Sequence, residues 1–182
     1  MIYRVSFLFY LLSYSALADV ISPTDLLNSE LKKNYSFTER SLNQSDLKIE
    51  SSSGNIFFDA KGITVNVLSP FEENYRIEGD SLEIHDVFLD QKQIINIREA
   101  NIFFLNLLIN GIDENASEYK VNHTNDAVTE IIPNDGSSSI KFFFNNKALN
   151  LIRYQDSIGV EHGIELTPIS VSYTHLTLPT KA

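Results

Sequence analysis

The chain has 182 residues, no cysteine, and a formal net charge of −10 with a pI near 4.8. So acidic a protein is repelled by nucleic acid and by anionic membrane surfaces, and we expect neither as a partner. Without cysteine the chain can form no disulfide and carries no lipid-attachment cysteine.

Residues 1–18 are typical of a secretory signal peptide. Arg4 supplies the positive start, residues 5–12 the apolar segment, and Ala16-Leu17-Ala18 the small-residue cleavage pattern. The apolar segment is shorter than the roughly 20 residues that a membrane-spanning helix needs. We therefore expect an exported protein that is not membrane-embedded.

A short helix is predicted to begin at Ser22. Ser22 can cap it, Pro23 suits its first position, and Asp25 favours the positive end of the helix dipole. An apolar stripe at Leu26, Leu27 and Leu31 follows, and Lys32-Lys33 ends the helix.

From residue 35 the apolar period becomes two, which indicates half-buried β-strands. Strands are expected at residues 37–42, 47–50, 55–60, 63–67, 75–78, 82–85 and 93–97. A turn is predicted at the Ser-Ser-Ser-Gly segment 51–54, and another at Lys61-Gly62.

Residues 102–111 are the most apolar stretch after the signal segment. At helical spacing the run is apolar nearly all round, interrupted by Asn106 and Asn110, so a helix here needs cover on more than one side. Gly111 is a reasonable helix stop. A strand with Phe103, Leu105, Leu107 and Ile109 on one face remains the alternative.

Five more strands are expected at residues 118–122, 128–132, 139–145, 149–154 and 160–166. There is no alternation of strands with helices. The sequence therefore predicts a mainly β fold in one domain, residues 19–170: a curved antiparallel sheet forming an incomplete, unclosed barrel covered by short helices.

The last segment, residues 171–182, resembles the translation of a sequencing adaptor. We treat it as a non-native tail and expect the natural chain to be cut short near Ile169, so His175 carries no functional weight.

Catalytic patterns are not found. Outside the tail the histidines are His85, His123 and His162, with no metal-ligand spacing, and there is no nucleophile elbow. We expect no enzyme, no cofactor and no metal site. What remains is apolar surface, including twelve phenylalanines, which either fills a core or lines a ligand cavity.

Turn residues and strand positions in the segment 61–97 follow a recognisable spacing, namely Lys61-Gly62, Ser69-Pro70, Gly79, Leu82, Asp86, Leu89 and Gln91. In this spacing the segment resembles the family of periplasmic outer-membrane lipoprotein carriers, the LolA type. The order of signal peptide, opening helix, strands and mid-chain apolar run agrees with that family. Two departures stand out. The family's Phe-Arg-Trp reads Ile63-Thr64-Val65 here, without the arginine that latches the lid helix, and Glu83 and His85 replace two aromatic residues.

The resemblance implies a periplasmic carrier that binds the acyl chains of lipoproteins in an apolar cavity and transfers them from the inner to the outer membrane. Its partners would be acylated lipoproteins as cargo, a lipoprotein-releasing ABC transporter and an outer-membrane lipoprotein receptor, with the carrier itself a monomer. The alternative is a periplasmic sensor or regulatory binding protein of related fold that recognises another protein or lipid.

Periodicity assigns an acyl-binding wall to both the sheet and the apolar run, which would act as a lid. A register slip of one residue would turn every sheet position to the other face. A charge in the lid, such as Leu107→Asp, is expected to abolish cargo uptake with the sheet still folded. The predicted wall residues are Val65, Val67, Ile77, Ile84, Phe142 and Phe144 from the sheet, and Phe103, Phe104, Leu107 and Leu108 from the lid.

Overall fold

A computed structural model gives the fold and describes residues 21–43, 47–97, 103–125, 127–156 and 158–170. The predicted signal peptide and the predicted tail, residues 171–182, lie outside the described residues, so both stay predictions.

In the described part of the chain, eleven antiparallel strands form one sheet in the order β6-β5-β4-β3-β2-β1-β11-β10-β9-β8-β7. The strands are β1 (Tyr35–Asn43), β2 (Lys48–Phe58), β3 (Ile63–Ser69), β4 (Glu73–Glu78), β5 (Ser81–Asp86), β6 (Gln91–Asn96), β7 (Tyr119–Asn125), β8 (Val128–Pro133), β9 (Ile140–Asn145), β10 (Ala148–Gln155) and β11 (Glu161–Pro168). Because β6 and β7 form opposite edges, the sheet does not close into a barrel. The fold class expected from the sequence is confirmed.

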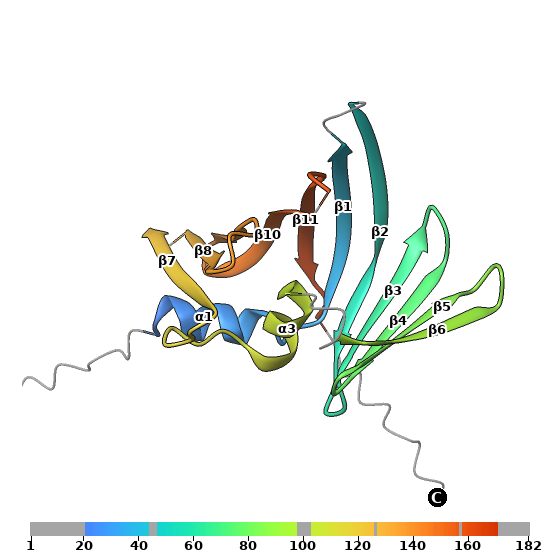
Figure 1. The fold of residues 1–182 in the computed structure, drawn as a ribbon, viewed down its shortest axis with the longest axis horizontal. Helices are drawn as coiled ribbons and strands as arrows, with labels where there is room; N and C mark the ends of the chain where they lie inside the picture. The colour runs from blue at the N-terminus through green and yellow to red at the C-terminus, as the bar shows by residue number, and fades with distance from the viewer. Residues whose placement is uncertain (1–20, 44–46, 98–102, 126, 157, 171–182) are drawn as a thin grey trace, which may run out of the picture.

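The pairing of β1 with β11 joins two meanders into the single sheet. Tyr35 lies opposite Pro168 and Leu42 opposite Glu161, so the first described strand pairs with the last described strand. In Figure 1 the strands β1–β6 fan out on one side of this junction and β7–β11 on the other, with the helices α1 (Pro23–Glu30) and α3 (Phe103–Asn110) near the base.

Helix α1 (Pro23–Glu30) begins as predicted. The hydroxyl of Ser22 accepts a hydrogen bond of 3.0 Å from the backbone N–H of Asp25, which satisfies one of the free donors of the first turn. Leu27 is fully buried and Leu31 nearly so, which places the apolar stripe against the sheet.

The apolar run is a helix, α3 (Phe103–Asn110), and not a strand. It ends at Gly111, whose φ of +77° is a left-handed conformation that glycine adopts without strain, and the N–H of Gly111 donates to the carbonyl of Leu107 at 2.9 Å. The helix is apolar on several sides because it lies between two clusters of buried side chains and contacts both.

The larger cluster joins α1 and α3 to β1 and β8–β11, with Leu27, Ile131, Phe142 and Leu149 at 0 % exposure. The smaller lies under β3–β5 and contains Ile63, Ile77, Leu82 and Ile97, with Leu105, Leu108 and Ile109 of α3 packed against it. α3 is thus the element that covers the β3–β5 side.

The turn predicted at residues 51–54 is wrong, because these residues lie inside β2. The glycine is required for space. A Cβ built on Gly54 would be 2.0 Å from the carbonyl oxygen of Asn66 and 2.9 Å from the ring of Phe37. The small residues therefore permit close packing at the irregularity between Ser53 and Gly54, where the β2–β3 register shifts.

Candidate functional site

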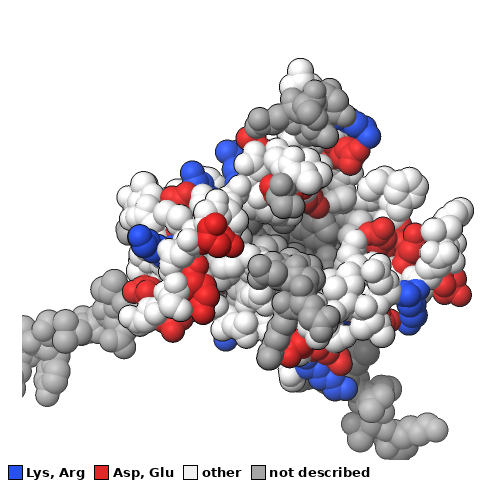
Figure 2. Space-filling view, viewed as in Figure 1, with Lys and Arg blue, Asp and Glu red and all other residues white. Residues whose placement is uncertain are grey.

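A cavity of about 380 Å³ lies between α3 and the inner face of the sheet. Its wall combines Phe104, Leu105 and Leu108 of α3 with side chains of β1–β5, β10 and β11. Figure 2 shows a hollow in this view of the molecule, with acidic side chains above it and to its right. The remaining wall residues are Leu31, Tyr35, Phe37, Glu39, Ile56, Phe58, Val65, Val67, Tyr75, Ile77, Leu82, Leu149, Ile152, Tyr154, Ile164 and Leu166.

The size of the cavity suits one acyl chain. A methylene takes up roughly the volume of one water molecule in the liquid, about 30 Å³, so there is room for about a dozen. A second hollow of about 410 Å³ has Lys32, Asp59 and Lys61 in its wall beside the β2–β3 turn, and is therefore less suited to an apolar ligand.

Five of the ten wall residues predicted from the sequence lie in the wall of the 380 Å³ cavity. Val65 and Val67 come from β3, Ile77 from β4, and Phe104 and Leu108 from α3. Val65 and Ile77 share a face because Val65 pairs with Tyr75 and Ile63 with Ile77. Whether these residues contact a ligand stays a prediction.

The other five lie elsewhere. Ile84 packs against the smaller cluster, and Phe103 meets the ring of Tyr119 edge-on at 5.8 Å. Leu107, Phe142 and Phe144 are 2 %, 0 % and 9 % exposed and belong to the larger cluster. Phe142 and Phe144 are core residues because side chains of α1 and α3 pack in the same cluster, and Leu107 is the fully buried residue that α3 contributes to it.

This placement overturns the expected outcome of Leu107→Asp. Because Leu107 is 2 % exposed within the core, an aspartate there would leave an unpaired charge among apolar side chains. The variant would damage the fold itself. Phe104, Leu105 and Leu108 are half-buried and line the cavity, so they are the positions of α3 where a change alters the cavity wall directly.

Periodicity missed the central part of the wall, which comes from β1, β10 and β11. Tyr35, Phe37 and Glu39 alternate along β1, and Ile164 and Leu166 alternate along β11. The alternation is visible in the sequence, but the β1–β11 pairing that brings these residues together joins segments more than a hundred residues apart.

The position of the family's latching arginine does not face the cavity. Thr64 on β3 accepts a hydrogen bond of 2.7 Å from the guanidinium of Arg76, on the opposite face from Val65. Glu83 and His85 alternate with the inward residues of β5. Glu83 binds Lys92 at 2.9 Å, and His85 lies 3.1 Å from Asp90.

Asn28 holds the C-terminal end of α3 to α1. Its side-chain NH₂ donates to the carbonyl of Ile112 at 2.8 Å, and its side-chain oxygen accepts from the N–H of Ile112, also at 2.8 Å. Asp113 follows, and its N–H donates to the hydroxyl of Tyr119 at 2.9 Å. A two-way amide contact therefore fastens the covering helix at this end.

A buried carboxylate supports the base of the cavity. Glu30, 2 % exposed, accepts hydrogen bonds from the Tyr35 hydroxyl at 3.0 Å, from Lys33 at 2.5 Å and from the N–H of Leu149 at 3.1 Å. Burial opposes the charge, but these donors outweigh it and hold the pKa of Glu30 below its ordinary value. Burial and the Glu30 carboxylate together raise the pKa of Tyr35.

The opposite end of the cavity is polar. Glu39 is the one charged residue among the described wall residues, and it accepts from Ser52 at 3.1 Å and lies 2.8 Å from Nδ1 of His162. The His162 ring stacks on Tyr154 with centroids 4.6 Å apart, and Tyr154 stacks on Phe104 of α3 at 5.5 Å. The covering helix thus touches the polar end through stacked rings.

Within the described residues no group of three or more His, Asp or Glu side chains is arranged to hold a metal ion. His162 illustrates why, since its Nδ1 faces Glu39 and its Nε2 faces Asp156 at 3.3 Å, on opposite edges of the ring. None of the helices in this part of the chain is long and apolar enough to span a membrane.

No protein-family model and no curated protein matches the chain. Among solved structures, the LolA superfamily protein NE2245 from Nitrosomonas europaea is 9 % identical, with a TM-score of 0.43 over 80 % of this chain and 90 % of that one. LprF from Mycobacterium bovis is 10 % identical, with a TM-score of 0.33 over 82 % of this chain and 95 % of that one.

Proposed function

We propose that this protein is a carrier that shields an acyl chain from water in the cavity under α3. The observation that supports the proposal is the cavity itself: about 380 Å³, walled by apolar side chains of α3 and of seven strands. Burying a methylene contributes about 0.8 kcal/mol, so a dozen contribute roughly 10 kcal/mol before the costs of binding.

A carrier must also release its cargo, and α3 is suited to control release. Opening the cavity would expose Phe104, Leu105 and Leu108 and break the stacking of Phe104 on Tyr154. The free energy needed to expose these side chains offsets part of the gain from burying the chain. Cargo can then pass to a tighter receptor without any chemical step in this protein.

Together with the predicted signal peptide, the proposal includes the location of the carrier and the direction of transfer. The carrier would act in the periplasm, receive acylated lipoproteins from a lipoprotein-releasing ABC transporter and deliver them to an outer-membrane receptor. These partners come from the sequence resemblance and are part of the proposal.

The cavity can be tested with N-phenyl-1-naphthylamine, a probe whose fluorescence rises in apolar surroundings. The protein should bind it, and amphiphiles with a dodecyl chain should displace it. Val67→Asp, which puts a charge in the wall, should weaken binding at least about tenfold. Ile94→Asp is the matched control, because Ile94 is 71 % exposed on β6 and Gln93 and Ile95 beside it pair with the inward residues Ile84 and Leu82.

Mass spectrometry of material that copurifies with the protein tests the cargo. Acylated proteins or lipids are expected, and crosslinking in cells should capture them. A protein that binds no probe and copurifies with a peptide partner but no lipid would contradict the carrier and favour the sensor.

A further inference from the structure

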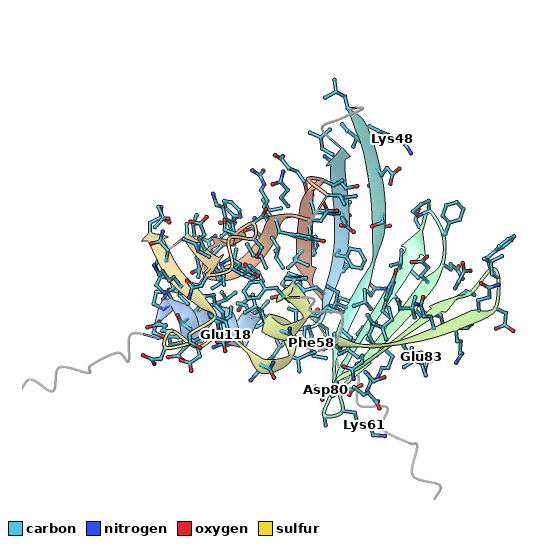
Figure 3. All side chains as sticks on the ribbon, viewed as in Figure 1. Lys48, Phe58, Lys61, Asp80, Glu83 and Glu118 are labelled. Atoms are coloured by element: carbon cyan, nitrogen blue, oxygen red, sulfur yellow. The ribbon has the colours of Figure 1, made fainter. Side chains whose placement is uncertain are left out.

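The inner face of the sheet changes character along its strands. Near α3 it presents Tyr35 and Phe37 on β1 and Phe58 on β2, and further along it presents Glu39 and Ser52. Figure 3 shows Phe58 at the end of β2 beside α3 and Lys48 at the far end of the same strand. A ligand with its chain in the apolar part therefore has its polar end at the level of Glu39.

The neighbouring strands carry further carboxylates on the inner face, in the row of Phe37, one inward position nearer to α3 than Glu39. Glu73 pairs with Val67, which lines the cavity, and Asp86 pairs with Glu73. Residues directly opposite each other in an antiparallel ladder share a face. Glu73 and Asp86 therefore face inward like Val67. Lys48 lies at the other end of β2, opposite Asn43, and binds Glu50 at 2.5 Å.

The group formed by Glu39, His162 and Asp156 carries a net negative charge in either protonation state of His162. Glu39 and Asp156 carry two negative charges, and His162 between them adds none or one positive charge, which leaves −2 or −1. Burial and the charge of Glu39 raise the pKa of the Tyr154 hydroxyl, and burial, Glu73 and Glu39 do the same for Tyr75. Both phenols therefore stay neutral beside the polar end.

We propose that Glu39 makes the cavity selective for amphiphiles whose polar end donates a hydrogen bond, such as an amide or ammonium N–H, over those that end in a free carboxylate. This inference rests on the proposed function, because it concerns the same cavity. It separates acylated amines and amides from free fatty acids of the same chain length.

The physical reason is the spare capacity of the Glu39 carboxylate. An ionised carboxylate has about four lone-pair sites, and Ser52 and His162 use two of them. An N–H donor at the end of the chain can take a third, and hydrogen bonds to charged acceptors are the stronger ones. A fatty-acid carboxylate would meet a like charge in partly buried surroundings, since the side chain of Glu39 is 27 % exposed.

The test compares dodecylammonium, N-dodecylacetamide and dodecanoate at neutral pH as displacers of N-phenyl-1-naphthylamine. Dodecanoate should bind about tenfold more weakly than dodecylammonium, with the amide between them. Glu39→Gln should reduce this ratio to near one, and Glu73→Gln should reduce it less. Glu165→Gln is the matched control, because Glu165 is exposed on β11 and pairs with Thr38, on the face of the sheet opposite Glu39.

The outcomes separate the two proposals. If no amphiphile displaces the probe, the carrier itself is wrong. If all three bind equally and Glu39→Gln changes nothing, the carrier stands and the selectivity is wrong. If Glu165→Gln changes the ratio as much as Glu39→Gln does, net charge is the cause and the assignment to Glu39 is overturned. Thermal unfolding of each variant shows that it is folded, and Glu73→Gln replaces Glu39→Gln if the latter is not.

Discussion

The two sides of the sheet share one pattern of alternation but bury their inner faces to different degrees. On β8 and β9, Ile131 and Phe142 are 0 % exposed and lie outside the cavity wall. On β3 and β4, Val65 and Tyr75 remain half-buried and line a cavity. The difference is the cover, because α1 packs onto β8 and β10 whereas, among the helices described, it is α3 that packs against the cluster of β3–β5.

This difference shows how a filled core and a cavity can arise from similar strands. Alternation decides which side chains face inward, and the length and position of the helices decide whether those side chains touch anything. Here α3 is eight residues long and lies at the junction of both sides, so it completes one core and leaves space beside the other.

The largest expected effect tests the difference in burial directly. Phe142→Ala should lower the free energy of unfolding by about 3–5 kcal/mol, since the ring is fully buried and its removal leaves a cavity. Val67→Ala, on the half-buried side, should cost only about 1 kcal/mol. Urea unfolding measures both, and equal losses would contradict the assignment of one side as filled and the other as open.

Two strand glycines near the junction should respond differently to alanine. Gly54→Ala should destabilise by about 1–3 kcal/mol, because its Cβ would overlap the carbonyl of Asn66 in backbone that cannot easily move. Gly163→Ala should be neutral or slightly stabilising, since the nearest atom to its Cβ, the carbonyl oxygen of Arg40, is 3.9 Å away. Similar melting temperatures for the two variants would show that β2 and β3 are not closely packed there.

A pH dependence of stability is expected at the base of the cavity, through Glu30. Its pKa is lowered in the folded state, so its contribution is fully present above the ordinary Glu value of about 4.3 and is lost as pH falls through the folded value. Glu30→Gln should cost about 1–3 kcal/mol at pH 7, because the buried donors around it lose their charged acceptor. The difference between wild type and variant should shrink in acid, and a constant difference in urea midpoints from pH 7 to pH 3 would refute this role.

Local signals predicted the elements well because their causes are local. Ser22-Pro23 starts α1 and Gly111 ends α3, each through contacts within one turn of the helix. The turn predicted at residues 51–54 was wrong because Ser and Gly favour turns in general. Gly54 is needed here for the close approach of Asn66, which only the folded sheet creates. The contact joins two strands, so the spacing of residues along one strand cannot predict it.

The cavity was harder to predict because it depends on contacts between distant segments. Val65, Val67 and Ile77 were found from alternation, and they line it. Phe142 and Phe144 show the same alternation but lie under α1 and α3, and Glu39 enters the wall only because β1 is the central strand. The alternation of apolar residues therefore identified the inner face of the sheet, but not the part of that face that the helices leave open as a cavity.

The smallest expected effect concerns Asn28, which ties the cover of the open side to the helix of the filled side. Asn28→Ala removes two hydrogen bonds to Ile112 and should cost about 1–2 kcal/mol. Because the sheet does not depend on them, amide exchange should quicken at the C-terminal end of α3 and stay unchanged in β1 and β11. Probe uptake should become faster, since the cover opens more often.

Ser29→Ala, which removes a single exposed hydrogen bond on the same helix, is the control. Faster exchange across the whole sheet, or none in α3, would mean that this contact does not govern the cover.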